Sequence, residues 1–187
     1  GWRPVATQTP EETSAARAER VLAEAPERFS LIGHSLGGYI VLEMIRQQPG
    51  RVARLALLNT SARPDTAEAT RLRNERVAET RAGRYAEVRA ASFPLSVHPD
   101  RVGDAHLREM SRLTGEDSGP DAYVRQQAAI IARIDQRPFL KDIRVPTLVL
   151  SGDKDMLISN ELSKEMAQMI PGATLVIARP DAVEPDR

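Results

Sequence analysis

The 187-residue sequence contains no cysteine. This absence excludes a disulfide framework, a cysteine nucleophile and a metal site built from thiolates. Histidine is also scarce, with three residues in the whole sequence: His34, His98 and His106. Any chemistry that needs an imidazole from this chain must use one of these three. No cofactor and no metal are expected.

The sequence also lacks an excess of either charge and lacks long apolar runs. Lysine plus arginine and aspartate plus glutamate number 26 each, so the formal net charge is zero. Without a net field to attract polyanions, nucleic acid and anionic membranes are not expected partners. No apolar run approaches the roughly 20 residues that span a bilayer. These features favour a cytoplasmic protein that acts on a small molecule, and they leave the oligomeric state open.

The first residues, Gly1-Trp2-Arg3-Pro4, contain neither a methionine nor the apolar stretch of a signal peptide. We therefore expect the sequence to begin inside a longer protein. Its length suffices for one well-buried core.

Apolar periodicity predicts an alternation of helices and short strands. A first helix is expected to start at Thr9-Pro10-Glu11-Glu12, which combines a capping box with proline at the first helical position, and to end at Pro26. Further helices are expected over 39–48 and from Ser159 or Asn160 to 170. Strands are expected at 29–32, 55–58, 145–150 and 173–178. The nearly continuous apolar character of 55–58 is typical of a strand buried on both faces, which predicts a parallel sheet with helices on both sides.

Residues 61–136 differ from the rest of the chain. Arginine, glutamate and alanine dominate, and glycines and prolines interrupt several helical stretches. We predict a helical insertion at 61–136 and a discontinuous α/β core at 1–60 and 137–187. Eight apolar residues of the insertion are expected to pack its helices or to line a pocket: Phe93, Leu95, Val97, Met110, Leu113, Tyr123, Ile130 and Ile131.

The segment Gly33-His34-Ser35-Leu36-Gly37 matches the pattern G-x-S-x-G, and Gly38 follows it. An apolar strand precedes this pattern and an amphipathic helix follows it, which is the context of a nucleophile elbow. At such a turn the serine hydroxyl stands above the sheet edge, and Gly33 and Gly37 are expected to be required because flanking backbone comes close. The backbone N–H of Leu36, at the helix start, is expected to donate to an oxyanion.

Three segments resemble the α/β-hydrolase superfamily, and the resemblance spans nearly the whole chain. They are FSLIGHSLGGYIVLEM at 29–44, RVARLALLNT at 51–60 and VPTLVLSGDKD at 145–155. The resemblance implies a partial α/β-hydrolase fold, mostly parallel and flanked by helices, with an inserted helical lid. It implies a serine hydrolase with Ser35 as nucleophile, truncated at both ends relative to the superfamily. Small carboxylesterases, proline-iminopeptidase-like enzymes and cofactor-free haloperoxidase-like hydrolases are similar.

The acid of the superfamily follows a late strand in the pattern Gly-x-x-Asp, which corresponds to Gly152 and Asp155 here. In that role Asp155 holds the tautomer of a histidine and stabilises its protonated form. Asp153 is the alternative acid. No ligand pattern accompanies these two aspartates that favours a metal site.

The base is missing from the expected place. No histidine follows Asp155, although Pro180-Asp181-Ala182 resembles the approach to the loop that carries it. His34 lies beside the nucleophile at a variable position and is not expected to be the base. His98 and His106 are expected to be ordinary lid residues, and His98 is the better candidate for a substitute base.

The part before Ser35 is short, with 34 residues. It leaves no visible source for the second oxyanion donor of the superfamily. It also leaves the strand before Ser35 without one neighbour, so its open edge predicts poor solubility or self-association.

The leading hypothesis is a carboxylesterase-like serine hydrolase that cleaves a small ester or related acyl substrate, impaired in this chain because the histidine is missing. One alternative is a non-catalytic relative that binds a ligand under the lid. Another is haloperoxidase-like chemistry without a cofactor, which halogenation in the presence of peroxide and acetate would reveal.

Overall fold

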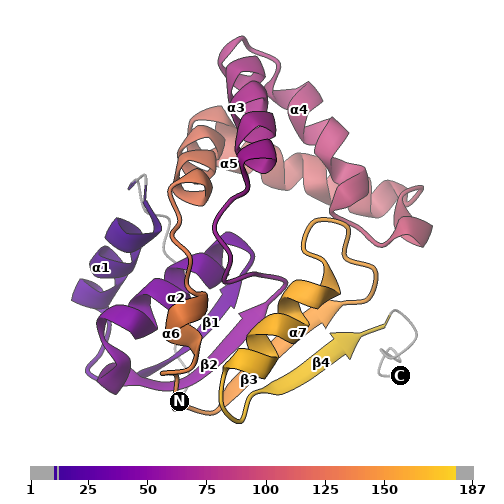
Figure 1. Ribbon diagram of the computed structural model, residues 1–187. Coiled ribbons are helices and arrows are strands. Elements are labelled where there is room, and N and C mark those ends of the chain that lie inside the picture. The colour runs from indigo at the N-terminus through magenta and orange to yellow at the C-terminus, as the bar shows by residue number, and fades with distance from the viewer. Residues whose placement is uncertain (1–10, 12, 180–187) are drawn as a thin grey trace.

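The computed structural model describes residues 11 and 13–179, and its centre is a four-stranded sheet (Figure 1). The strands are β1 (Phe29–His34), β2 (Val52–Leu58), β3 (Thr147–Gly152) and β4 (Thr174–Ala178). All neighbours pair in parallel, in the order β1-β2-β3-β4. The predicted α/β class with a parallel sheet is confirmed, although β2 begins earlier than the apolar run suggested.

Helices cover one face of this sheet: α1 (Ser14–Glu24), α2 (Leu36–Gln47), α6 (Arg137–Leu140) and α7 (Asn160–Met169). Their apolar residues form one cluster with the strand residues Leu55, Leu57 and Val149. The strand order advances in one direction, so right-handed crossovers place the connecting helices on the same side.

The prediction of helices on both faces is therefore wrong for the described residues. Within β2, Leu55 and Leu57 are buried against the helices, whereas Ala56 and Leu58 are partly exposed on the other face. That face carries a hollow of about 440 Å³, lined in part by Ile32, Ala56 and Leu148. Ile32 is 66% exposed. The apolar run of β2 had suggested double burial because sequence alone does not show which helices are present to cover each face.

We expect the chain to self-associate at micromolar concentration, because within residues 13–179 β1 pairs with β2 alone and presents Ile32 beside its open edge. Ile32→Lys adds a charge at this position and should shift sedimentation toward the monomer. Met110→Lys is the matched control. Met110 is also an exposed apolar residue, but it belongs to the helix Ala105–Ile131 and not to the sheet. A wild-type chain that sediments as a sharp monomer would contradict the expectation.

Helix α1 is fixed at both ends. Thr13 caps its start, accepting a hydrogen bond from the backbone N–H of Ala16 at 3.1 Å. The helix thus begins at Ser14, later than predicted, and the expected cap at Thr9, Pro10 and Glu12 lies outside the described residues.

At the other end of α1 the Arg51 guanidinium donates to the carbonyls of Leu22, Ala25 and Pro26 at 2.7–3.0 Å. Arg51 therefore satisfies carbonyls that a helix end leaves without partners.

Residues 61–136 contain the helices α3 (Ala67–Arg81), α4 (Tyr85–Ser92) and α5 (Ala105–Ile131), which lie together on one side of the rest of the molecule (Figure 1). Short 3₁₀ turns occur at Phe93–Leu95 and Pro99–Arg101, and another described one, at Pro49–Arg51, precedes β2. Helix α5 breaks at Gly119, where φ is 75°, next to Pro120. Of the apolar residues expected to pack or line a pocket, Phe93 and Tyr123 are buried, whereas Met110 and Leu113 are exposed.

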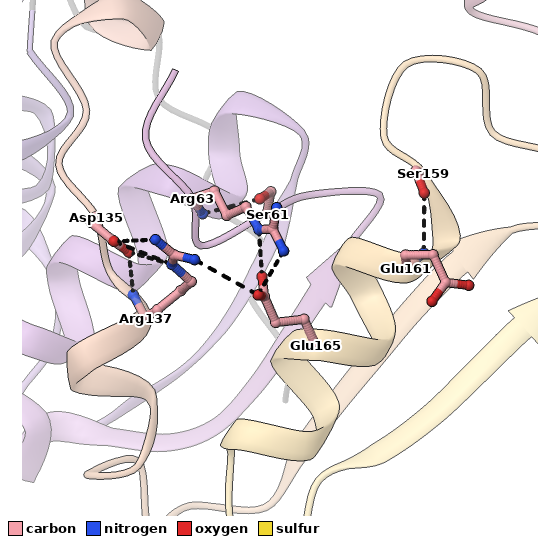
Figure 2. A network of polar contacts seen from close by, with 7 residues as sticks. All are labelled: Ser61, Arg63, Asp135, Arg137, Ser159, Glu161 and Glu165. Atoms are coloured by element: carbon pink, nitrogen blue, oxygen red, sulfur yellow. Dashed lines mark hydrogen bonds and ion pairs between the residues drawn. The ribbon is translucent and has the colours of Figure 1, made fainter. Parts of the chain in front are cut away.

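The two segments that lead into and out of these helices meet at α7 (Figure 2). Arg63 donates from Nε and Nη2 to the Glu165 carboxylate at 2.9 and 2.8 Å, and Arg137 pairs with Asp135 at 2.6 Å. Arg137 also lies 3.9 Å from Glu165. The hydrogen bonds from Arg63 lower the pKa of Glu165, and those from Arg137 lower the pKa of Asp135. The ion pairs thus join both crossing segments to the core, although exposure and salt weaken them.

Candidate active site

Ser35 occupies a sharp turn between β1 and α2. Its backbone angles are φ 50° and ψ −118°, a conformation that costs about 1–3 kcal/mol for a residue other than glycine. Its N–H donates to the Leu58 carbonyl at 3.0 Å, and its own carbonyl accepts from the Gly38 N–H and the Thr60 hydroxyl, both at 2.9 Å. Hydrogen bonds on both sides of the residue therefore hold the strained turn in place.

Two glycines around the turn are needed for close approach. A Cβ on Gly33 would lie 2.5 Å from the Val41 side chain and 2.6 Å from the Gly37 carbonyl oxygen. A Cβ on Gly38 would lie 2.1–2.5 Å from the side chain of Thr60, which is fully buried. At Gly37 a Cβ would meet nothing within 4 Å. The expectation that Gly33 must be small agrees with this geometry. The same expectation for Gly37 is wrong, because the tight contact falls one residue later.

The start of α2 presents its first backbone N–H groups beside Ser35. Leu36 is the first residue of the helix, so its N–H has no acceptor within the helix. This position suits an oxyanion donor, and the positive end of the helix dipole adds to it. His34 is exposed and shares the strand face of Ile32, since side chains two apart in a strand point the same way.

Asp155 lies in the turn that follows β3, and both of its carboxylate oxygens are hydrogen-bonded. Oδ1 accepts from the N–H groups of Leu157 and Ile158, each at 2.8 Å. Oδ2 accepts from the Asn59 side-chain amide at 2.5 Å. Since Asn59 directly follows the residue that binds Ser35, the structure links Asp155 to the serine turn.

Asp153 has a different environment. Its N–H donates to the Ala178 carbonyl at 2.7 Å, and its Oδ1 accepts from the N–H of Lys154 at 3.1 Å. These contacts tie Asp153 to the end of β4 and to its own turn. Within the described residues, no hydrogen bond joins the Asp153 side chain to the residues around Ser35, which distinguishes it from Asp155.

His98 and His106 lie within residues 61–136. His98 precedes the turn Pro99–Arg101, and its Nδ1 accepts from the Asp100 N–H at 3.2 Å while lying 3.6 Å from Asp100 Oδ2. His106 is exposed near the start of α5. Over residues 13–179, no hydrogen bond connects either imidazole to Ser35 or Asp155. The predicted approach to a histidine loop at 180–182 lies outside the described residues.

Residues 11 and 13–179 include no group of three or more histidine, aspartate or glutamate side chains placed to hold a metal ion. No helix among them combines the length and apolar character that crossing a membrane requires.

Sequence reasoning missed Asn59 and Thr60, which it treated only as the end of a strand. The signal that could have identified them is their position: two polar residues directly after a buried strand, at the carboxyl edge of a parallel sheet. Ligands and catalytic groups gather at that edge in open α/β sheets.

Comparison with known proteins gives consistent matches. The family model for the alpha/beta hydrolase fold matches residues 24–182. RutD of Caulobacter sp. (strain K31), to which carbamate hydrolysis is ascribed, is 29% identical over 189 residues, covering 94% of this chain and 68% of that protein. The pimeloyl-[acyl-carrier protein] methyl ester esterase of Aromatoleum aromaticum is 30% identical over 175 residues, covering 87% of this chain and 70% of the esterase.

A solved structure agrees with these matches. The thermophilic esterase from Thermogutta terrifontis superimposes with a TM-score of 0.80 at 25% identity, covering 89% of this chain and 64% of the esterase. The chain thus spans about two thirds of the length of the proteins that it resembles.

Proposed function

Because this chain belongs to the alpha/beta hydrolase fold family, we propose that it carries the nucleophile and the acid of a serine hydrolase for small ester or related acyl substrates. The observation that supports this most strongly is the strained turn at Ser35, with φ at 50°. A packing role gives no reason to keep a serine in that conformation. A nucleophile at a strand-to-helix turn, with its hydroxyl beside a helix start, does give such a reason.

The proposed reaction is acyl transfer through Ser35. The Ser35 Oγ forms a bond to the carbonyl carbon of the ester, its proton passes to a base, and the carbonyl electrons move onto oxygen. The Leu36 N–H stabilises this oxyanion. When the intermediate collapses, the bond to the alcohol breaks and the leaving alkoxide takes the proton from the base. Water then releases the acid from Ser35 in the same two steps.

Asp155 is the proposed acid of this site, in preference to Asp153. It shares a hydrogen bond with Asn59, and the neighbours of Asn59 hold the Ser35 turn. No histidine follows Asp155 in the 187 residues, and we propose that the base is supplied from outside them. Turnover by this chain alone is therefore expected to be low.

The substrate class is proposed from the relatives. Two of these relatives are named as esterases, and one of the two is named for a methyl ester. A third relative is named as a carbamate hydrolase. These bonds share a carbonyl carbon joined to a leaving oxygen or nitrogen.

We propose that residues 61–136 form a lid over the site and that 1–60 with 137–187 form the core. Chemistry of the haloperoxidase kind and a purely ligand-binding role stay alternative hypotheses.

The test uses a fluorophosphonate probe with imidazole as an external base. Imidazole is small enough to stand in for a missing histidine side chain. We expect the wild-type chain to be labelled slowly, and the rate to increase with imidazole concentration. Ser35→Ala should show no imidazole-dependent labelling. Equal labelling of the wild type and Ser35→Ala would contradict the proposal.

His98→Ala and His106→Ala complete the experiment. Both variants should be labelled at the wild-type rate, with and without imidazole, because neither side chain contacts Ser35 or Asp155 in the described residues. A variant that lost its labelling in the absence of imidazole would instead identify a substitute base within residues 61–136.

A further inference from the structure

Asn59 lies between the two proposed catalytic residues. It follows β2 directly and has a left-handed backbone, with φ at 43°. Its N–H donates to the Leu150 carbonyl of β3 at 2.8 Å, which fixes the residue across the ends of two strands. From there its side-chain amide reaches Asp155 Oδ2 at 2.5 Å. This residue therefore connects the end of β2 with the turn that carries the acid.

The residues on either side of Asn59 hold the nucleophile. The Leu58 carbonyl accepts from the Ser35 N–H at 3.0 Å, and the Thr60 hydroxyl donates to the Ser35 carbonyl at 2.9 Å. Three consecutive residues thus hold Ser35 and Asp155, which are separated by 120 positions in the sequence. Residues 58–60 therefore fix the position of Ser35 relative to Asp155.

The hydrogen bonds of Asp155 differ between its two oxygens. A carboxylate oxygen has two lone pairs to offer. The N–H groups of Leu157 and Ile158 occupy both lone pairs of Oδ1. Among the described residues, Asn59 is the donor to Oδ2, and it occupies one of the two lone pairs. Oδ2 is therefore the Asp155 oxygen that can accept a further hydrogen bond from an imidazole N–H.

We infer that Asn59 is a positioning residue of the hydrolase site: it holds the Asp155 carboxylate so that Oδ2 receives the N–H of the catalytic imidazole. Asn59 touches neither the substrate nor Ser35 Oγ and acts only through Asp155. The inference rests on the proposed function, in which Asp155 is the acid.

The test measures how Ser35 labelling by a fluorophosphonate depends on imidazole concentration. In this reaction the Ser35 Oγ–phosphorus bond forms, the phosphorus–fluorine bond breaks, fluoride leaves, and the hydroxyl proton passes to imidazole. If Oδ2 binds the imidazole N–H, disturbing the carboxylate raises the imidazole concentration needed for half-maximal labelling.

Asn59→Gly removes the amide and keeps the left-handed backbone, which glycine adopts without strain. We expect it to raise the half-maximal imidazole concentration about tenfold, as the loss of one hydrogen bond to a charged group would. Asp155→Asn should have at least the same effect. The double variant should match Asp155→Asn alone, because residues that act as a unit are not additive.

Asn160→Ala is the matched control. The Asn160 amide also holds the end of β3, donating to the Ser151 Oγ and the Gly152 carbonyl at 2.8 Å, and no hydrogen bond among the described residues joins it to Asp155. A role for Asn59 that is only structural would make Asn59→Gly behave like Asn160→Ala, with lower stability and an unchanged imidazole dependence. That result would overturn the inference and leave the proposed function intact. Additive effects of Asn59→Gly and Asp155→Asn would overturn it as well. A wild-type chain whose labelling does not respond to imidazole would overturn both.

Discussion

Gly38→Ala is expected to lower the free energy of unfolding by about 3 kcal/mol, the upper range for overpacking a closed site. The new Cβ would lie 2.1 Å from the Thr60 hydroxyl oxygen and 2.4 Å from the Thr60 Cβ. Thr60 is fully buried and hydrogen-bonded to the Ser35 carbonyl, so it cannot move aside without loosening the serine turn. Denaturant unfolding followed by circular dichroism measures the loss.

Gly37→Ala, one residue away in the same helix, is the control for this result. Its Cβ meets nothing within 4 Å, and alanine favours the helix over glycine, so we expect a gain of up to about 1 kcal/mol. Opposite effects at adjacent glycines of one motif would establish that the close approach is at Gly38. Equal losses at the two positions would contradict the packing described for the elbow.

Asp65→Ala is the second substitution with a large expected effect, a loss of about 3–5 kcal/mol. The Asp65 side chain is 3% exposed and pairs with Arg73 through Oδ2 and with Arg133 through Oδ1, each at 3.0 Å. The Arg133 guanidinium in turn lies over the Tyr39 ring, 4.5 Å from its centroid. Removing the carboxylate leaves two guanidinium groups without their anion where residues 61–136 meet helix α2.

Glu109→Ala tests whether burial is the cause of that loss. Glu109 also pairs with an arginine, Arg112 at 2.7 Å, but both side chains are about half exposed. Because solvent screens such pairs, the unfolding midpoint of the Glu109→Ala variant should stay close to that of the wild type. If Asp65→Ala unfolded at the same midpoint as Glu109→Ala, the stability of the protein would not depend on the buried ion pairs of Asp65.

Much of the fold follows from local sequence patterns. Apolar runs identified all four strands, and the glycines around Ser35 identified the turn, because both signals depend on neighbouring residues. Which faces of the sheet the helices cover could not be predicted in this way. Whether Ala56 and Leu58 are covered depends on which helices lie across the sheet, and that is a property of strand order rather than of the strand itself.

The candidate site was predictable to a similar extent. Ser35 and the Gly152–Asp155 turn have recognisable patterns, whereas Asn59 has none, since its role depends on a contact with a residue 96 positions away. The spacing of the motif also assigned the close approach to Gly37. The neighbour that makes Gly38 necessary is Thr60, and the sequence does not show that these two residues meet.

Ser35 is the proposed nucleophile, and the most direct test of this role is to locate the adduct. The wild-type chain is labelled with a fluorophosphonate in the presence of imidazole, digested, and sequenced by tandem mass spectrometry. We predict that the phosphonyl group is on Ser35, within the peptide that spans Gly33 to Gly38. An adduct on another serine, or spread over several side chains at comparable levels, would contradict the account.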